Sequence, residues 1–159
     1  MNGNFSERMR SVLEHVKEEA LRLGDDSIGV EHLILGIIRE GEGSAIQVLN
    51  ILGLDKNDLR KIIEEVVSID DKKYIDYHGK NKKISKQAEN ILNKSIMELN
   101  EVNDKHVKTI HVLLSILKDK NNIVFSTLQK LKIDYNKVLE AYLEIQDRFE
   151  DTPGDDEST

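Results

Sequence analysis

The chain has 159 residues, enough for one domain, and its composition of 38% hydrophobic and 33% charged residues suits helices with one buried face. The absence of cysteine excludes disulfide frameworks and thiolate zinc sites. A formal charge of −7, a polar start without signal-peptide character and the lack of a long apolar run indicate a soluble, cytoplasmic protein. We expect it to bind neither nucleic acid nor membrane and to be monomeric in isolation.

Four helical segments are predicted in the first half of the chain. Ser6 caps the first helix, whose apolar residues recur at three- and four-residue steps until Gly24. The second begins near Val30 and is apolar almost throughout, as expected for a buried central helix. A short third helix stops at Gly53, and Asp55 caps the fourth.

A polar connector, about residues 68–83, follows the first half and is expected to be a loop with room for a short extended stretch around Tyr74–Tyr77. The second half, about 84–149, is expected to repeat the same four segments, with Thr109 capping its central helix. Residues 150–159 are acidic and lack aliphatic side chains, which predicts a flexible linker start.

The two halves match each other 79 positions apart without a gap. Phe5-Ser6 corresponds to Ile84-Ser85, His32 to His111 and Leu49 to Leu128. A duplication bounds the fold, because two copies that each have a thin core bury more apolar surface by packing together. We therefore predict an all-α domain over 1–149 in which two four-helix repeats, 5–67 and 84–149, are related by a pseudo-twofold axis.

Recognisable catalytic motifs are absent from the sequence. Gly41-Glu42-Gly43 lacks the Lys-Ser/Thr of a nucleotide-binding loop and is interpreted as a turn. Glu31 and His32 permit a metal site with His15, His106 and His111 as further ligands. They also permit a catalytic role, but the spacing identifies no second catalytic group. Because His32 and His111 are equivalent in the two halves, structural histidines are the favoured interpretation. We predict that this chain is not itself an enzyme.

One basic stretch leaves RNA binding open as an alternative. Lysines 80, 82, 83 and 86 lie near Tyr74, Tyr77 and His78, and basic residues interleaved with aromatics can contact single-stranded RNA. The stretch falls in the connector, where solvated charges are ordinary, so a loop is the favoured interpretation.

Three runs of the first half carry a specific resemblance. The sequences Phe5–Arg8, Glu18–Gly24 and, above all, Ile28–Gly43 resemble the Clp N-terminal repeat, most closely that of ClpC-type AAA+ unfoldases. The resemblance implies a doubly repeated helical domain that docks protein substrates and adaptors for a hexameric ATP-driven unfoldase. It further implies that ATP and magnesium bind to separate downstream modules, which feed a ClpP-type peptidase, and that this chain itself holds no cofactor. The alternative is a freestanding Clp-repeat adaptor without an ATPase.

The resemblance also implies a pocket for phosphorylated arginine in each repeat. By motif, Ser6 and Glu31 belong to the first pocket, where a carboxylate would pair with the guanidinium and a hydroxyl would meet the phosphate. The second repeat keeps Ser85 and Thr109 but has Ile110 in the place of the carboxylate, so the second pocket is expected to be lost.

The second copy also departs from the motif at its glycine positions, which favours the first copy as the recognition surface. The predicted substrate- and adaptor-binding residues are Ser6, Glu31, Arg39, Glu40 and Glu42.

Overall fold

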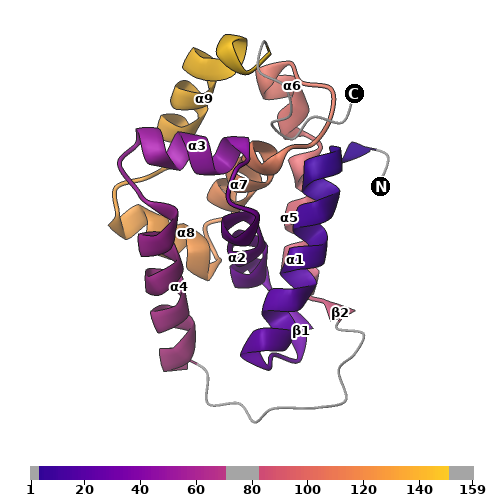
Figure 1. The fold of residues 1–159 in the computed structure, drawn as a ribbon, viewed down its shortest axis with the longest axis vertical. Coiled ribbons are helices and arrows are strands. Elements are labelled where there is room, and N and C mark those ends of the chain that lie inside the picture. Colours follow the sequence, from indigo (N-terminus) through magenta and orange to yellow (C-terminus); the bar gives the residue numbers. More distant parts are fainter. Residues whose placement is uncertain (1–3, 71–82, 151–159) are drawn as a thin grey trace.

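The computed structural model describes residues 4–70 and 83–150, most of which are helical (Figure 1). The first repeat contains α1 (Glu7–Leu23), β1 (Ser27–Ile28), α2 (Val30–Glu40), α3 (Ser44–Ile51) and α4 (Lys56–Asp70). The second repeat contains β2 (Lys83–Ile84), α5 (Lys86–Ser95), α6 (Glu98–Val102), α7 (Thr109–Lys118), α8 (Ile123–Lys130) and α9 (Tyr135–Glu150). The predicted all-α fold is confirmed, with one short strand pair added.

Two of the predicted segments lie outside this description. They are the stretch around Tyr74–Tyr77, with Lys80 and Lys82, and the tail after residue 150. Helix α4 continues to Asp70, into the stretch predicted as connector, whose last residue Lys83 opens β2. None of the described helices combines the length and the apolar character that crossing a bilayer requires.

The helix ends of the first repeat follow the predicted capping chemistry. The Ser6 hydroxyl accepts a hydrogen bond from the Met9 amide at 3.0 Å, and Gly24 ends α1 at φ +70°, a conformation that glycine adopts without steric cost. The Asp55 carboxylate accepts from the amide of Asn57 at 2.9 Å. These contacts satisfy backbone groups that have no partner within a helix.

The second repeat differs in its first helix, which is divided into α5 and α6. The prediction that this repeat copies all four segments is wrong at this point. At the break the Ser95 hydroxyl donates to the Leu92 carbonyl at 2.6 Å, and the Met97 amide bonds to the Lys94 carbonyl in a tightened turn. A serine that bonds back to the preceding turn competes with the helical ladder and bends helices, whereas the first repeat has Val16 at this position.

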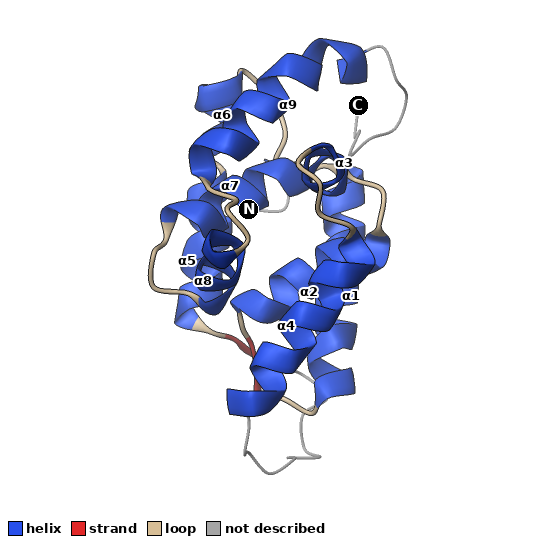
Figure 2. Ribbon diagram, turned by 90° about the vertical axis from the view of Figure 1, so that its left-hand side faces the viewer, coloured by secondary structure: helices blue, strands red, loops and turns tan. Residues whose placement is uncertain are grey.

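A reciprocal exchange of backbone hydrogen bonds joins the two repeats. The Ser85 amide donates to the Ile28 carbonyl at 2.8 Å, and the Ser6 amide donates to the Val107 carbonyl at 2.9 Å. The two bonds are equivalent, because Ser85 lies 79 positions after Ser6 and Val107 lies 79 positions after Ile28. Accordingly, β1 and β2 form the short parallel strand pair drawn in red in Figure 2, with Ile28 opposite Ile84. Phe5 and Val107 form an equivalent bridge. This reciprocity is the signature of the predicted pseudo-twofold axis.

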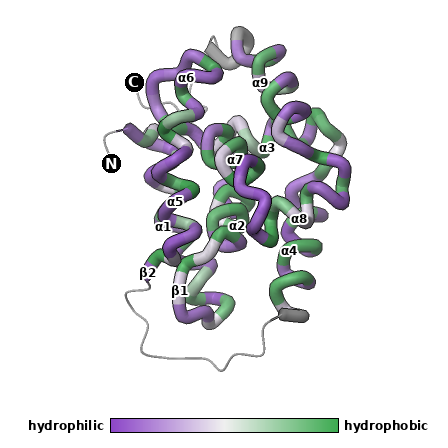
Figure 3. The backbone as a smooth tube through the Cα atoms, turned by 180° about the vertical axis from the view of Figure 1, so that it is seen from behind, coloured by the Kyte–Doolittle hydropathy of each residue, from purple (hydrophilic) through white to green (hydrophobic). Residues whose placement is uncertain are grey.

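The central helices α2 and α7 lie in the middle of the molecule, with the other helices around them (Figure 3). Leu33 of α2 and Leu113 of α7 are fully buried, and both belong to one continuous core cluster. Helix α2 approaches α1 closely at Gly36, where a Cβ atom would lie 2.4 Å from the Val16 side chain. Because the two repeats share a single core, we expect them to unfold as one cooperative unit.

Thr109 and Ser44 make a polar contact between the repeats, whereas the residues at the equivalent positions, Val30 and Ile123, are apolar. Thr109 is the first residue of α7, and its buried hydroxyl accepts from the Ala45 amide at 3.0 Å, while Ser44 accepts from the Ile110 amide at 3.3 Å. Thr109 was predicted to cap α7, but the cap position belongs to Lys108. The threonine hydroxyl instead connects α7 to α3 of the other repeat.

Candidate docking surfaces

The structure separates two residues that the sequence assigned to one pocket. Ser6 precedes α1 and bonds to Val107 of the second repeat, whereas Glu31 follows β1, beyond the other end of α1 (Figure 1). A helix of 17 residues is roughly 25 Å long. The prediction that Ser6 and Glu31 share a pocket is therefore wrong, because the exchange between the repeats places the start of α1 beside α7.

Ser85 takes the position near Glu31 that was predicted for Ser6. The Ser85 amide bonds to the Ile28 carbonyl, three residues before Glu31, and the Ser85 hydroxyl accepts from the Ala88 amide at 3.1 Å. The Glu31 carboxylate folds over Gly29, where an added Cβ atom would lie 2.6 Å from its Oε1. The start of α2 from one repeat and the start of α5 from the other thus form one composite corner.

The opposite corner lacks a carboxylate at the equivalent position. Ser6 lies there beside the start of α7, where Ile110 replaces glutamate and is fully buried. An aliphatic side chain cannot pair with a guanidinium, so the two corners are chemically different.

His32 is held on both sides by its own repeat. The Gly29 amide donates to Nδ1 at 2.8 Å, so Nε2 carries the proton that binds the Asp25 carboxylate at 2.6 Å. Asp25, Glu31 and His32 place potential ligand atoms within 4.8 Å of one another. However, both ring nitrogens of His32 are already engaged, which favours the predicted structural role over metal binding.

The second repeat keeps this histidine arrangement without the glutamate. The Lys108 amide donates to Nδ1 of His111 at 2.7 Å, and Nε2 lies 2.9 Å from Asp104. Burial alone would raise the pKa of Asp104, but the hydrogen bond from His111, the charge of Lys108 and the Tyr142 hydroxyl lower it below its ordinary value. The histidine–aspartate pair thus closes the turn before each central helix.

Arg39 and Glu40 form ion pairs within the first repeat. The Arg39 guanidinium lies 3.4 Å from Glu18, and Glu40 pairs with Arg8 at 2.6 Å. Glu42 is exposed, and its backbone amide donates to Glu40 at 3.0 Å. A ligand at this end of α2 would compete with these ion pairs, and a binding role for Arg39, Glu40 and Glu42 stays a prediction.

A buried carboxylate on α1 was not identified from the sequence. Glu19 is 1% exposed and accepts hydrogen bonds from Arg22, Arg39 and Arg60 at 2.8 to 3.2 Å, and two of these arginines also bind Glu64. Burial alone would raise the pKa of Glu19, but the arginine hydrogen bonds outweigh it and lower the pKa. This network ties together α1, α2 and α4.

The 79-residue offset is the signal that would have revealed this carboxylate. Glu98 is the counterpart of Glu19, is also buried, and pairs with Lys118, the counterpart of Arg39, at 2.9 Å. The Tyr135 hydroxyl donates to Glu98 at 2.6 Å, and burial together with this carboxylate raises the pKa of the phenol. Charged pairs at matching positions of both repeats distinguish these glutamates from the exposed acidic residues.

An apolar groove of about 410 Å³ opens where α1 meets the strand pair and α5. Leu13 and Leu92, which are equivalent residues of the two repeats, line it together with Ile84. Ile84 is 37% exposed. Arg10, Glu14 and Lys17 of α1 also line the groove. The groove offers an apolar floor beside charges of both signs, which suits a segment of another protein.

The fold defines a helical double-repeat domain with an apolar groove between its repeats. The family model described as the Clp repeat (R) N-terminal domain matches residues 4–131 and 83–158. The chain belongs to this family.

Individual relatives agree with this assignment. The "Negative regulator of genetic competence ClpC/MecB" of Bacillus subtilis is 32% identical over 145 residues, and "Chaperone protein ClpB" of Oceanobacillus iheyensis is 30% identical over 145 residues. Each match covers 91% of this chain and only 17% of the relative's length. The solved N-terminal domain of ClpD from Arabidopsis thaliana has a TM-score of 0.68 at 19% identity, over 91% of this chain and 96% of that one.

Proposed function

We propose that this chain is the substrate- and adaptor-docking N-terminal domain of an ATP-dependent Clp unfoldase that supplies a ClpP-type peptidase. The observation that carries the proposal is the open apolar groove between the repeats of a Clp-family domain. ATP and magnesium would bind to downstream modules, and this chain would work without a cofactor. The cytoplasm is the expected compartment, and the separate domain is expected to be a monomer.

The groove has the chemistry to hold short apolar segments of unfolded proteins. Its volume of about 410 Å³ accommodates a few side chains. Each apolar Å² removed from water contributes about 25 cal/mol. Such binding is broad in specificity, because apolar contacts require no particular hydrogen-bonding partner.

Ile84→Glu is expected to weaken binding of a permanently unfolded protein, such as reduced and carboxymethylated lactalbumin, by about tenfold or more, because it places a charge in the apolar groove. Fluorescence anisotropy of the labelled protein measures this. Ile51→Glu is the matched control, since Ile51 is 57% exposed on α3, outside the groove, and should leave binding unchanged. Equal binding by both variants would exclude the groove as the docking site.

We further propose that the composite corner at Glu31 and Ser85 binds phosphorylated arginine, with the Glu31 carboxylate paired to the guanidinium and the Ser85 hydroxyl bonded to the phosphate.

Glu31→Ala is expected to lower the affinity for a phosphoarginine peptide at least tenfold, because a charge-assisted pair is lost. Ser85→Ala and Ser6→Ala both remove an N-cap hydrogen bond, and because Ser6 is the more deeply buried, Ser6→Ala controls for loss of stability. Calorimetric titration should show weaker binding only for Ser85→Ala; an equal loss in both would assign the effect to stability.

A freestanding adaptor remains the second candidate. It shares the docking domain but lacks an ATPase, so the coding sequence beyond Thr159 discriminates between the two. Walker motifs there would support the unfoldase, and a stop codon would support the adaptor.

A further inference from the structure

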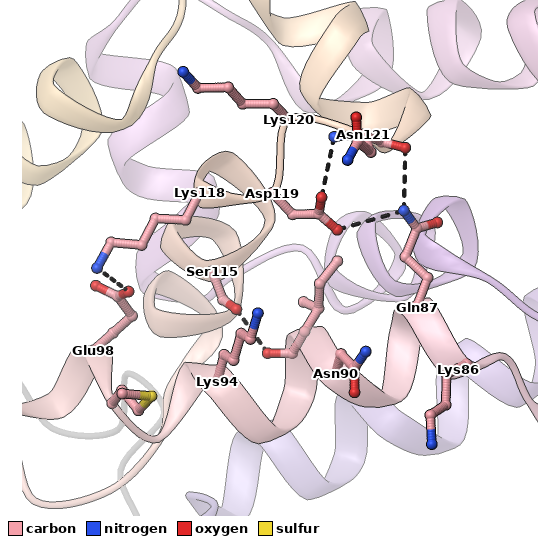
Figure 4. Close-up of a pocket in the computed structure, with 12 residues that line it drawn as sticks. Lys86, Gln87, Asn90, Lys94, Glu98, Ser115, Lys118, Asp119, Lys120 and Asn121 are labelled. Atoms are coloured by element: carbon pink, nitrogen blue, oxygen red, sulfur yellow. Dashed lines mark hydrogen bonds and ion pairs between the residues drawn. The ribbon is translucent and has the colours of Figure 1, made fainter.

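The second repeat contains a larger pocket that the proposed function does not use. It has a volume of about 930 Å³ and lies between α5 and the carboxyl end of α7 (Figure 4). Ile91 and Ser115, which are almost fully buried, are joined by a hydrogen bond of 2.7 Å in its floor. Gln87 closes one end by bonding to the carbonyl of Asn121 at 3.1 Å.

A charged pair closes the opposite end of the pocket. Lys118 reaches Glu98 at 2.9 Å, and Glu98 is 2% exposed (Figure 4). Met97 lines the pocket at the break between α5 and α6, and it is 67% exposed. An unbranched, flexible methionine adapts to apolar ligands of different shape. The pocket therefore offers apolar surface at its floor and rim, between two polar ends.

The equivalent surface of the first repeat is spanned by ion pairs. Arg8 and Glu40, the counterparts of Gln87 and Asp119, pair at 2.6 Å. Glu18, the counterpart of Met97, pairs with Arg39 at 3.4 Å, and α1 continues past it without a break. In the second repeat Gln87 and Asp119 are joined only by a hydrogen bond of 3.4 Å, and Met97 lies at the division of the first helix, so this surface differs in charge and in backbone path from its first-repeat counterpart.

The exposed rim also carries more positive charge than its counterpart in the first repeat. In the second repeat Lys86, Lys94 and Lys120 are exposed at the pocket, whereas the counterparts of the first two are Glu7 and His15. The carboxylates that line the pocket are Glu98, which is paired with Lys118, and Asp119. The exposed rim therefore carries net positive charge on a chain whose formal charge is −7.

We propose that this pocket binds an acidic segment of a partner protein, in which carboxylates flank one bulky apolar side chain. The apolar side chain would lie against Ile91 and Met97, and the carboxylates would face Lys86, Lys94 and Lys120. The proposal rests on the docking function for the nature of the ligand, a protein segment, but it places that ligand on a surface different from the central groove.

The test uses a short fluorescein-labelled peptide with aspartate and glutamate on both sides of a single central phenylalanine. Lys94→Glu combined with Lys120→Glu is expected to weaken its binding about tenfold or more, since two attractive charges become repulsive. Met97→Gln, which removes apolar contact at an exposed position, should weaken binding several-fold. Binding by the parent chain should also fall as salt is raised.

The control combines Lys105→Glu with Lys130→Glu. Both lysines are exposed in the same repeat and outside this pocket, so the net charge changes equally. If the control pair weakens peptide binding as much as Lys94→Glu with Lys120→Glu does, the peptide is held by general charge attraction and the proposal is wrong. Equal binding of a peptide whose acids are replaced by amides would also overturn it, as would tighter binding of an oligouridine than of the acidic peptide.

The two docking hypotheses can fail separately. If unfolded lactalbumin binds through Ile84 but the acidic peptide does not bind, only the pocket proposal is wrong. If the acidic peptide binds through Lys94 and Lys120 while unfolded protein does not bind, the pocket stands and the client-docking function is wrong.

Discussion

Leu33→Asp is expected to unfold both repeats together, with a loss of about 5 kcal/mol or more, because a charge replaces a side chain that is fully buried at the centre of the shared core. Leu113→Asp, the equivalent change in α7, should do the same. Loss of this size approaches the whole stability of an ordinary domain. Far-ultraviolet circular dichroism during urea unfolding measures the result.

Leu21→Asp is the control for this pair of variants. Leu21 is 51% exposed on α1, so the same chemical change there should alter stability by less than about 1 kcal/mol. Retention of about half of the helical signal in Leu33→Asp would show that the repeats fold independently, contrary to a single core.

Glu19→Gln is expected to lower the free energy of unfolding by about 2–3 kcal/mol, because hydrogen bonds from three arginines to a buried charge are weakened at once. The arginines can still reach water, which limits the loss. Glu65→Gln, at an exposed position of α4, is the control and should stay within about 0.5 kcal/mol of the parent. Urea titration at neutral pH provides both values.

The network of Glu19 and its three arginines should make the free energy of unfolding depend on pH. The pKa of Glu19 is lower in the folded chain than in the unfolded chain, so the unfolded chain binds more protons between the two values. The stabilisation is present above the unfolded pKa and is lost as pH falls through the folded pKa. Asp104 contributes in the same direction. Glu19→Gln should therefore reduce, without abolishing, the loss of stability on acidification, and an unchanged pH dependence would contradict this role.

The fold was predictable because its information is local and repeated. The 79-residue offset indicated two equal helical units, and Ser6, Gly24 and Asp55 marked helix ends through contacts with residues next to them in the chain. The histidines were also interpretable, since His32 and His111 are partnered within their own turns.

The candidate site was less predictable because it is formed by contacts between the repeats. Nothing in the spacing of Ser6 and Glu31 indicates that each repeat places the start of its first helix against the other repeat. The pocket of the second repeat was missed for a related reason. Met97 lines it at the helix break that follows Ser95, and neither residue stands out in the sequence.

The exchanged backbone bonds have a consequence for the origin of the domain. In a single ancestral unit the amide before the first helix would have bonded to water, whereas pairing two copies through the same exchange would have given a symmetric homodimer with two identical corners. Joining the genes removed the requirement that both corners stay the same. One could then keep its acidic residue at Glu31 while the other acquired Ile110 and became part of the interior.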